Sequence, residues 1–322
     1  MTALGTVAGR NASEGRKTAR RRARATPTVF LAPAAVLVVV FFAVPVVLIG
    51  VLSFTDMSTA TGLREWNFIG WDNYRRIINH PNFGINARAT LFYVVATLVL
   101  FNVGLGLVCA ILTTHIPRRS GFFFRALWLL PRITPVAVYI MMWKRIGERG
   151  PFGILNFHVL EPLFGGDGGN LVPGNPWAFV ILTNGLIGAS FGMILFTSAI
   201  ESIPKDFMNA ALVDGCGIWQ RIRFVILPSL KWPLLFVTTY QTLSLLTSFE
   251  YILLLTDGNF GTRVWSLWSY QTALATYFGN LQYGLGAAMA VLLVLIGIVA
   301  SLLYLRFFRF SELVEVPKIE TL

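Results

Sequence analysis

Charged residues and cysteines are both scarce in this sequence. Asp, Glu, Lys and Arg together make up 13% of its 322 residues, whereas a soluble domain carries roughly a quarter. This deficit excludes an ordinary water-soluble enzyme. Two cysteines are too few for a disulfide scaffold, and a hydrophobic content of 55% excludes intrinsic disorder.

The signatures of common catalytic and metal sites are missing as well. The sequence contains no G-x-x-x-x-G-K-[ST] loop, no H-E-x-x-H and no cluster of Cys and His. We therefore expect no metal site and no cofactor in this chain. Residues 188–192 fit G-x-S-x-G, but that motif acts at a strand-to-helix turn with a His and an acid nearby. Here it lies inside a long apolar run, so we interpret Gly188 and Gly192 as a small-xxx-small helix contact.

Long apolar runs are what the sequence has in abundance. A helix needs about 20 apolar residues to cross a membrane, and helices satisfy their own backbone polar groups in lipid. Six runs qualify and predict an all-α integral membrane protein with a membrane domain at 29–305. The first run is longer than the roughly 7–15 apolar residues of a signal peptide, so we expect it to be retained. The predicted spans are 29–54, 89–113, 122–143, 176–200, 233–255 and 284–305.

The excess of positive charge is explained by membrane topology. The formal net charge is +11. With the N-terminus in the cytoplasm, 17 of the 26 Lys and Arg fall in cytoplasmic segments and eight in outer segments, as the positive-inside rule requires. We therefore predict cytoplasmic termini, with a basic arm at 1–28 and a tail at 306–322. This charge pattern indicates that the chain is surrounded by membrane lipid and that its basic residues do not bind nucleic acid.

The segment between the fourth and fifth spans, residues 201–232, carries the most specific pattern. Pro204 followed by Lys and Asp predicts the start of a helix, and Gly215 predicts its end with a positive φ. A second amphipathic stretch is expected to run until Pro228 breaks it. Two short helices joined by a glycine turn would protrude at the cytoplasmic face. On these grounds alone, a hairpin that merely links two spans is an equally good interpretation.

This segment resembles the EAA loop of bacterial ABC-importer permeases, whose pattern is E-A-A-x-x-x-G-x9-I-x-L-P. Asn replaces the Glu and Val replaces the Ile. Flanking residues resemble the carbohydrate-uptake branch, the maltose- and glycerol-phosphate-type permeases, and further matches occur at 68–74, 153–156 and 255–258. The matching positions of the loop are Asn209, Ala210, Ala211, Gly215, Val225, Leu227 and Pro228.

The resemblance implies a non-catalytic permease subunit in a bacterial plasma membrane. In that family the EAA loop sits in a groove of a separate ATPase, which binds the ATP and Mg. The implied partners are a second permease subunit, two copies of the ATP-binding subunit, an extracytoplasmic solute-binding protein and a carbohydrate substrate. The residues implied to couple to the ATPase are Asn209, Ala210, Ala211, Asp214, Gly215, Leu227 and Pro228.

Polar residues inside spans are candidates for a substrate pathway. Gln241, Ser244 and Ser248 recur at i, i+3 and i+7, which predicts one shared helical face. The resemblance implies that sugar contacts come from the spans on either side of the loop. For each residue, a bond between helices is an equally good interpretation. The predicted pathway residues are Gly188, Phe191, Gln241, Ser244, Leu245 and Ser248.

Two charged residues within the predicted spans complete the candidates. Glu250, near the outer end, is predicted to shape the outer gate or to pair with a cation. Arg132, between Pro131 and Pro135, is predicted to lie at a kink and is a candidate for an ion pair with an acid. The alternatives to a sugar importer are an ABC importer of another solute and an ion-coupled secondary transporter, which would need more intramembrane carboxylates. A further alternative, a membrane-embedded enzyme, has no plausible catalytic cluster in this sequence to support it.

Overall fold

The computed structural model describes residues 31–62, 65–148, 153–154, 157–158, 174–275 and 279–308. Within these ranges the chain is helical, and extended backbone pairs only in an isolated antiparallel bridge between Thr55 and Phe68. The prediction of an all-α protein is therefore confirmed. The predicted arm at 1–28, most of the outer segment 144–175 and most of the tail at 306–322 lie outside the described residues.

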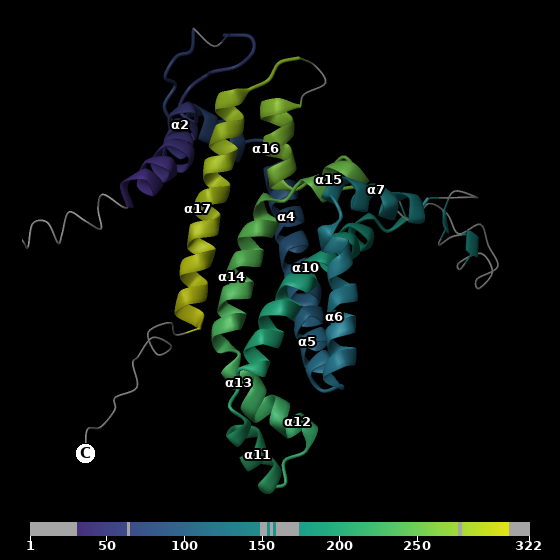
Figure 1. Ribbon diagram of the computed structural model, residues 1–322. Helices are drawn as coiled ribbons and strands as arrows, with labels where there is room; N and C mark the ends of the chain where they lie inside the picture. The colour runs from purple at the N-terminus through teal and green to yellow at the C-terminus, as the bar shows by residue number, and fades with distance from the viewer. Residues whose placement is uncertain are drawn as a thin grey trace, which may run out of the picture.

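The helices form an elongated bundle with a helical hairpin at one end (Figure 1). We call this end, which carries α11 to α13, the loop end. In chain order the elements are η1 (Val39–Ala43), α2 (Val44–Leu52), α3 (Asp72–Ile78), α4 (Phe83–Thr97), η2 (Leu98–Leu105), α5 (Gly106–Thr114), α6 (Arg118–Ile133), α7 (Val136–Ile146), α10 (Pro176–Glu201), α11 (Lys205–Val213), α12 (Ile218–Arg221), η5 (Ile222–Ile226), α13 (Leu227–Ser229), α14 (Lys231–Thr247), α15 (Glu250–Leu255), α16 (Trp265–Leu274) and α17 (Tyr283–Phe307).

Four continuous helices in the described residues are long and apolar enough to span a membrane: Leu31–Leu52, Phe83–Thr114, Pro176–Glu201 and Tyr283–Phe307. Two further candidates are bent pairs of helices. Arg118–Ile133 and Val136–Ile146 meet at 99°, and Ile218–Ser229 and Lys231–Thr247 meet at 67°. The described chain thus offers four spans, or up to six if each bent pair counts as one.

The predicted span at 122–143 is broken between α6 and α7. Thr134 has an extended backbone (φ −69°, ψ 137°) because the residue before a proline is pushed out of the helical region. Pro135 then starts α7, which runs at 99° to α6. The break lies two residues after Arg132, so the kink predicted between Pro131 and Pro135 is present, and at 99° it divides the predicted span into two helices.

The predicted span at 233–255 is interrupted as well. The helix α14 ends at Thr247, and Ser248 is extended (ψ 119°) before α15 starts at Glu250. The hydroxyl of Ser266 donates a 3.1 Å hydrogen bond to the Ser248 carbonyl, which satisfies an acceptor that the helix end leaves free. The Ser248 N–H still donates to the Ser244 carbonyl at 3.0 Å, so Ser248 closes the last turn of α14 and the helix does not continue beyond it.

The helix α10 lies at the centre of the bundle and packs closely against η2 and α5. Gly188 and Gly192 make this approach possible, since a Cβ at either position would collide with Asn102. The close helix contact that the sequence predicts at these two glycines is therefore present. The element packed against them is the π-helix η2, at Asn102.

The end opposite the loop is closed by α16, a helix that the sequence patterns did not predict. Its Trp265 and Trp268 are both 4% exposed. The Trp265 backbone N–H donates to the Thr90 hydroxyl at 2.8 Å, and its indole N–H donates to the Met289 carbonyl at 3.0 Å. These bonds hold α16 against α4 and α17.

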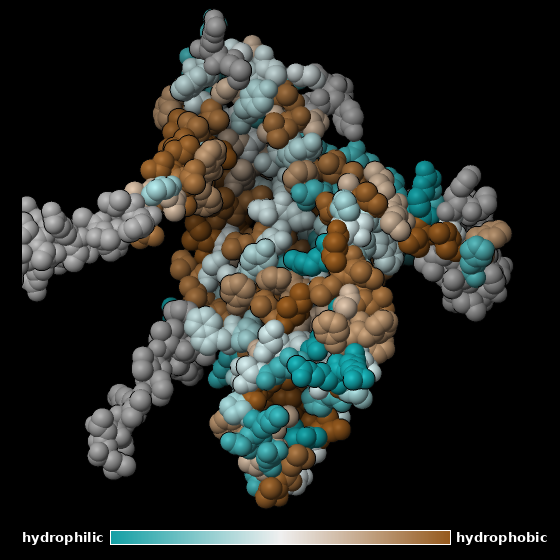
Figure 2. Space-filling model, viewed as in Figure 1, coloured by the Kyte–Doolittle hydropathy of each residue, from teal (hydrophilic) through white to brown (hydrophobic). Residues whose placement is uncertain are grey.

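The surface of the bundle separates by polarity along its long axis (Figure 2). Apolar atoms cover α2 and α17, whereas hydrophilic atoms gather around α11 to α13 and the neighbouring ends of α5 and α6. Such a broad apolar surface marks a lipid or protein contact.

Candidate functional site

The first helix of the loop, α11, ends in a well-formed glycine turn. Gly215 has a φ of +74°, as the sequence predicts. The Cys216 N–H donates to the Ala211 carbonyl at 2.9 Å, and the Gly215 N–H donates to the Leu212 carbonyl at 3.1 Å. These two bonds are the Schellman pattern, which satisfies the carbonyls that a helix end leaves free.

The second helical stretch of the loop continues further than predicted. It runs from Ile218 to Ser229 and passes through Pro228, and the 67° bend falls at Leu230. Pro228 follows the π-helical turn η5 within this stretch, and the axis bends two residues after it. The prediction that Pro228 breaks this helix is therefore wrong by two residues.

The loop hairpin presents one apolar surface outward and buries another. Ala211 is 7% exposed and faces the inside of the hairpin, where α11 packs against η5. Asn209, Ala210 and Asp214 are exposed. Six large apolar side chains of the hairpin are exposed, and a group of exposed apolar side chains marks a contact with protein or lipid. We call these six the docking surface, with their exposed fractions: Phe207 62%, Leu212 53%, Val213 88%, Ile218 58%, Trp219 82% and Phe224 65%.

The remaining coupling candidates lie at the base of the hairpin. Leu227 is half-buried and Pro228 is exposed. An ion pair joins this region to a third helix, since Arg125 on α6 donates to Glu201 at the end of α10 with an Nη1–Oε1 distance of 2.6 Å. The Arg125 side chain is 17% exposed and that of Glu201 is 56% exposed. Sequence reasoning missed this pair, because nothing local links residues 76 positions apart.

A second cluster of candidates lies halfway along the bundle, on α10 and α14. The rings of Phe191 and Tyr240 stack with centroids 4.8 Å apart, and those of Phe236 and Tyr240 lie 6.3 Å apart and nearly parallel. Tyr240 is 49% and Phe236 52% exposed. We call these three rings the aromatic plate. The sequence pointed to Phe191, and the structure adds its two neighbours from α14.

Arg132, at the end of α6, lies over this plate. Its guanidinium carbon is 5.4 Å from the centre of the Phe191 ring, and its Nη1 is 3.4 Å from the Ser190 hydroxyl. Among the described residues the ion pairs are Asp72–Arg75, Arg125–Glu201 and Arg145–Glu148, and Arg132 belongs to none of them.

Three predicted pathway residues are buried between helices. The Gln241 side-chain N–H donates to the Gly188 carbonyl at 2.9 Å, which joins α14 to α10, and Leu245 is 3% exposed. In this conformation their contacts are those of helix packing. Ser244 is exposed on α14, and Ser248 lies in the break after it.

Glu250 occupies the first turn of α15, beyond the break. Its carboxylate accepts a 3.2 Å hydrogen bond from the Phe249 N–H at the start of this short helix. None of the ion pairs within the described ranges includes Glu250. Its role at an outer gate stays a prediction.

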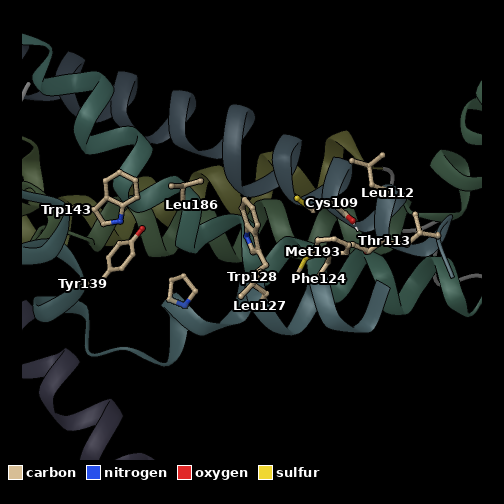
Figure 3. Close-up of a pocket in the computed structure, with 12 residues that line it drawn as sticks. Cys109, Leu112, Thr113, Phe124, Leu127, Trp128, Tyr139, Trp143, Leu186 and Met193 are labelled. Atoms are coloured by element: carbon tan, nitrogen blue, oxygen red, sulfur yellow. Dashed lines mark hydrogen bonds between the residues drawn. The ribbon is translucent and has the colours of Figure 1, made fainter. Parts of the chain in front are cut away.

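A cavity of about 680 Å³ lies between α5, α6, α7 and α10 (Figure 3). Its walls are mostly apolar, with Leu112, Leu127 and Leu186 among them. The Tyr139 hydroxyl at its wall already donates to the Thr183 carbonyl at 3.0 Å. A sugar would find few polar partners here, so this cavity is a poor candidate for its pathway. Within the described ranges, His, Cys, Asp and Glu form no group that could hold a metal ion.

Comparisons with known proteins point to membrane transport. The profile of the family described as "Binding-protein-dependent transport system inner membrane component" matches residues 102–310. A probable ABC transporter permease protein of Pyrococcus horikoshii is 30% identical over 285 residues, covering 86% of this chain and 93% of the relative. The sulfoquinovosyl glycerol transport system permease protein of Agrobacterium fabrum is 29% identical, covering 90% of this chain and 92% of the relative.

A solved structure shares the fold. It belongs to a bacterial ABC transporter involved in the import of the acidic polysaccharide alginate, with a TM-score of 0.77 and 20% identity. The match covers 91% of this chain and 98% of that one.

The helical bundle and its exposed hairpin define a membrane-embedded transport subunit. The chain belongs to the family of binding-protein-dependent transport system inner membrane components, the permease subunits of ABC importers. The identification made from the EAA pattern is thereby confirmed.

Proposed function

We propose that this chain is one of two permease subunits of an ATP-driven carbohydrate importer. The relatives support this substrate class, since one is named for sulfoquinovosyl glycerol transport and the solved transporter imports alginate. The aromatic plate supports it as well, because aromatic side chains with a few polar groups line most small-molecule sites. An extracytoplasmic binding protein would deliver the sugar to the end of the bundle opposite the loop.

We further propose that the loop end faces the cytoplasm. Lys and Arg concentrate on the cytoplasmic side of membrane proteins. The basic residues of this end are Arg118, Arg119, Arg125, Lys205, Arg221, Arg223 and Lys231. In this orientation the docking surface meets a soluble ATPase, and this exposed apolar surface is the observation that carries the proposal.

The connections of the helices support coupling between the loop and the proposed pathway. The helices α10 and α14 enter and leave the hairpin, and the Arg125–Glu201 ion pair ties α6 to the same base. These three helices carry Phe191, Tyr240 and Arg132. A displacement of the hairpin by the ATPase would therefore move the helices that carry the pathway, while the chain itself performs no catalysis.

The test is reconstitution with the second permease subunit, the ATP-binding subunit and the binding protein in lipid vesicles. We expect the sugar-loaded binding protein to stimulate ATP hydrolysis. Trp219→Asp should abolish co-purification of the ATPase, because the 82% exposed indole contributes to the docking surface. Phe260→Asp, which changes a 57% exposed ring in the segment between α15 and α16, should leave co-purification unchanged.

Two outcomes would contradict different parts of the proposal. If Trp219→Asp and Phe260→Asp both retain the ATPase, the hairpin is not its docking site. If the complex assembles but only a non-sugar solute stimulates hydrolysis, the carbohydrate assignment fails and the importer assignment stands.

A further inference from the structure

The side chain of Arg132 lies beside the middle of the candidate spanning helix α10. Its Nη1 is 3.4 Å from Ser190, which is near the middle of the 26-residue helix α10. At 1.5 Å per residue, Ser190 lies on the order of 16 Å from Glu201 at the loop end. Half of a hydrocarbon core is about 15 Å. A charged side chain at this depth is a functional residue by default.

The guanidinium of Arg132 lacks the partner that such a charge normally has. No acid of the described residues lies within ion-pair distance of it. The Ser190 hydroxyl donates its own proton to the Ile187 carbonyl at 2.6 Å and accepts from Arg132 across 3.4 Å, a distance at the long end of the hydrogen-bond range. A guanidinium has five N–H donors, and the hydrogen bond from Nη1 to Ser190 uses one of those of Arg132.

The surroundings of these donors suit one kind of ligand. The plate offers the partly exposed rings of Phe236 and Tyr240, and the Arg132 charge lies 5.4 Å above the ring of Phe191 beside them. A neutral sugar would use the rings and hydroxyls but leave the charge unpaired. A sugar with a carboxylate, sulfonate or phosphate would satisfy both, because a planar guanidinium binds such groups with two parallel hydrogen bonds.

We propose that Arg132 binds the anionic group of a charged carbohydrate and selects it over neutral sugars. This inference rests on the proposed function, since it requires a carbohydrate pathway along α6, α10 and α14. The plate then holds the sugar ring, and Arg132 fixes the position of the acidic substituent. Selectivity for charge would thus be present in the permease itself, in addition to the binding protein.

The test compares ATP-driven uptake by the reconstituted complex, with disaccharides of galacturonate and of galactose as probes. For the galacturonate disaccharide, Arg132→Gln should raise KM or reduce uptake at least about tenfold, as expected for the loss of a charge-assisted hydrogen bond. Arg132→Lys should restore part of the uptake, since it keeps the charge but loses the planar fork. Arg119→Gln removes the same charge from the loop end of α6 and should have no such effect.

Each other outcome identifies what has failed. Stimulation by the galactose disaccharide alone, with Arg132→Gln unchanged, overturns this inference and leaves the proposed function standing. Loss of the second permease subunit on purification of Arg132→Gln shows instead that the charge pairs with an acid of that subunit, which also overturns it. If no sugar of either kind stimulates ATP hydrolysis, the proposed carbohydrate function itself fails.

Discussion

The turn at Gly215 allows a quantitative test of how the hairpin keeps its shape. An added Cβ at Gly215 would meet nothing within 4 Å, so substitution introduces no collision. The φ of +74° is the only obstacle, and it costs an L-residue roughly 1–2 kcal/mol. Such a penalty lowers the ratio of ordered to disordered turn about five- to thirtyfold. Gly215→Ala should therefore loosen the hairpin without disturbing the membrane spans.

Gly217 offers a matched control two residues away. Its φ is −67°, which any residue adopts, and an added Cβ would make an ordinary contact with the Gln220 amide oxygen at 3.7 Å. Gly217→Ala alters only the N-cap of α12, where Ala is somewhat less favoured than Gly, and should have a smaller effect than Gly215→Ala. Gly215→Asn should lie between Gly215→Ala and the natural protein, because Asn tolerates a positive φ better than Ala does.

The assay has two parts. Hydrogen exchange followed by mass spectrometry should show faster exchange over residues 205–216 in Gly215→Ala, since the N–H groups of Gly215 and Cys216 lose their carbonyl partners. ATPase stimulation in the reconstituted complex should fall in parallel, while thermal unfolding of the purified chain stays unchanged. Equal effects of the two alanine substitutions, or no effect at Gly215, would refute the reasoning from backbone conformation.

Two further pairs of substitutions test side-chain packing, one pair in the hairpin and one pair in the spanning helices. Ala210→Trp adds a ring to an exposed position and should block ATPase co-purification while leaving the hydrogen-exchange pattern normal. Ala211→Leu overpacks a buried position and should destabilise the hairpin by about 1–3 kcal/mol. If the amides of α11 are equally protected from exchange in both variants, Ala211 is not packed as described. Gly192→Ala should lower the thermal stability of the detergent-solubilised chain because its Cβ would collide with the backbone carbonyl oxygen of Asn102, whereas Gly50→Ala meets open space and should not. An equal thermal midpoint for these two variants would contradict the close approach of α10 to η2.

The sequence predicted most reliably those features that depend on local chemistry. The positive φ of Gly215 follows from its place after a short helix, and the apolar runs locate the four continuous spans. The close helix contact at Gly188 was also readable, because only small residues permit it.

The features that sequence reasoning missed depend on residues far apart in the chain. The helix α14 ends at Thr247 without a proline or glycine, and Ser266 supports the break from 18 residues away. The burial of Ala211 beside the exposed Ala210 is decided by packing against η5 rather than by the EAA pattern. Local patterns describe the hairpin and the spans, but they do not say which of two neighbouring alanines faces inward.

The first span contributes least to the interior of the bundle. None of the residues of α2 is buried, and the helix touches the rest of the bundle mainly through α17. Asn73 holds its end by donating to the carbonyls of Ser53 and Thr55 at 3.0 and 2.8 Å. Lipid or the second permease subunit thus surrounds nearly every side chain along this helix. Substitutions among its apolar residues should leave the interior packing of this chain unchanged, whereas loss of the asparagine that anchors its end should not.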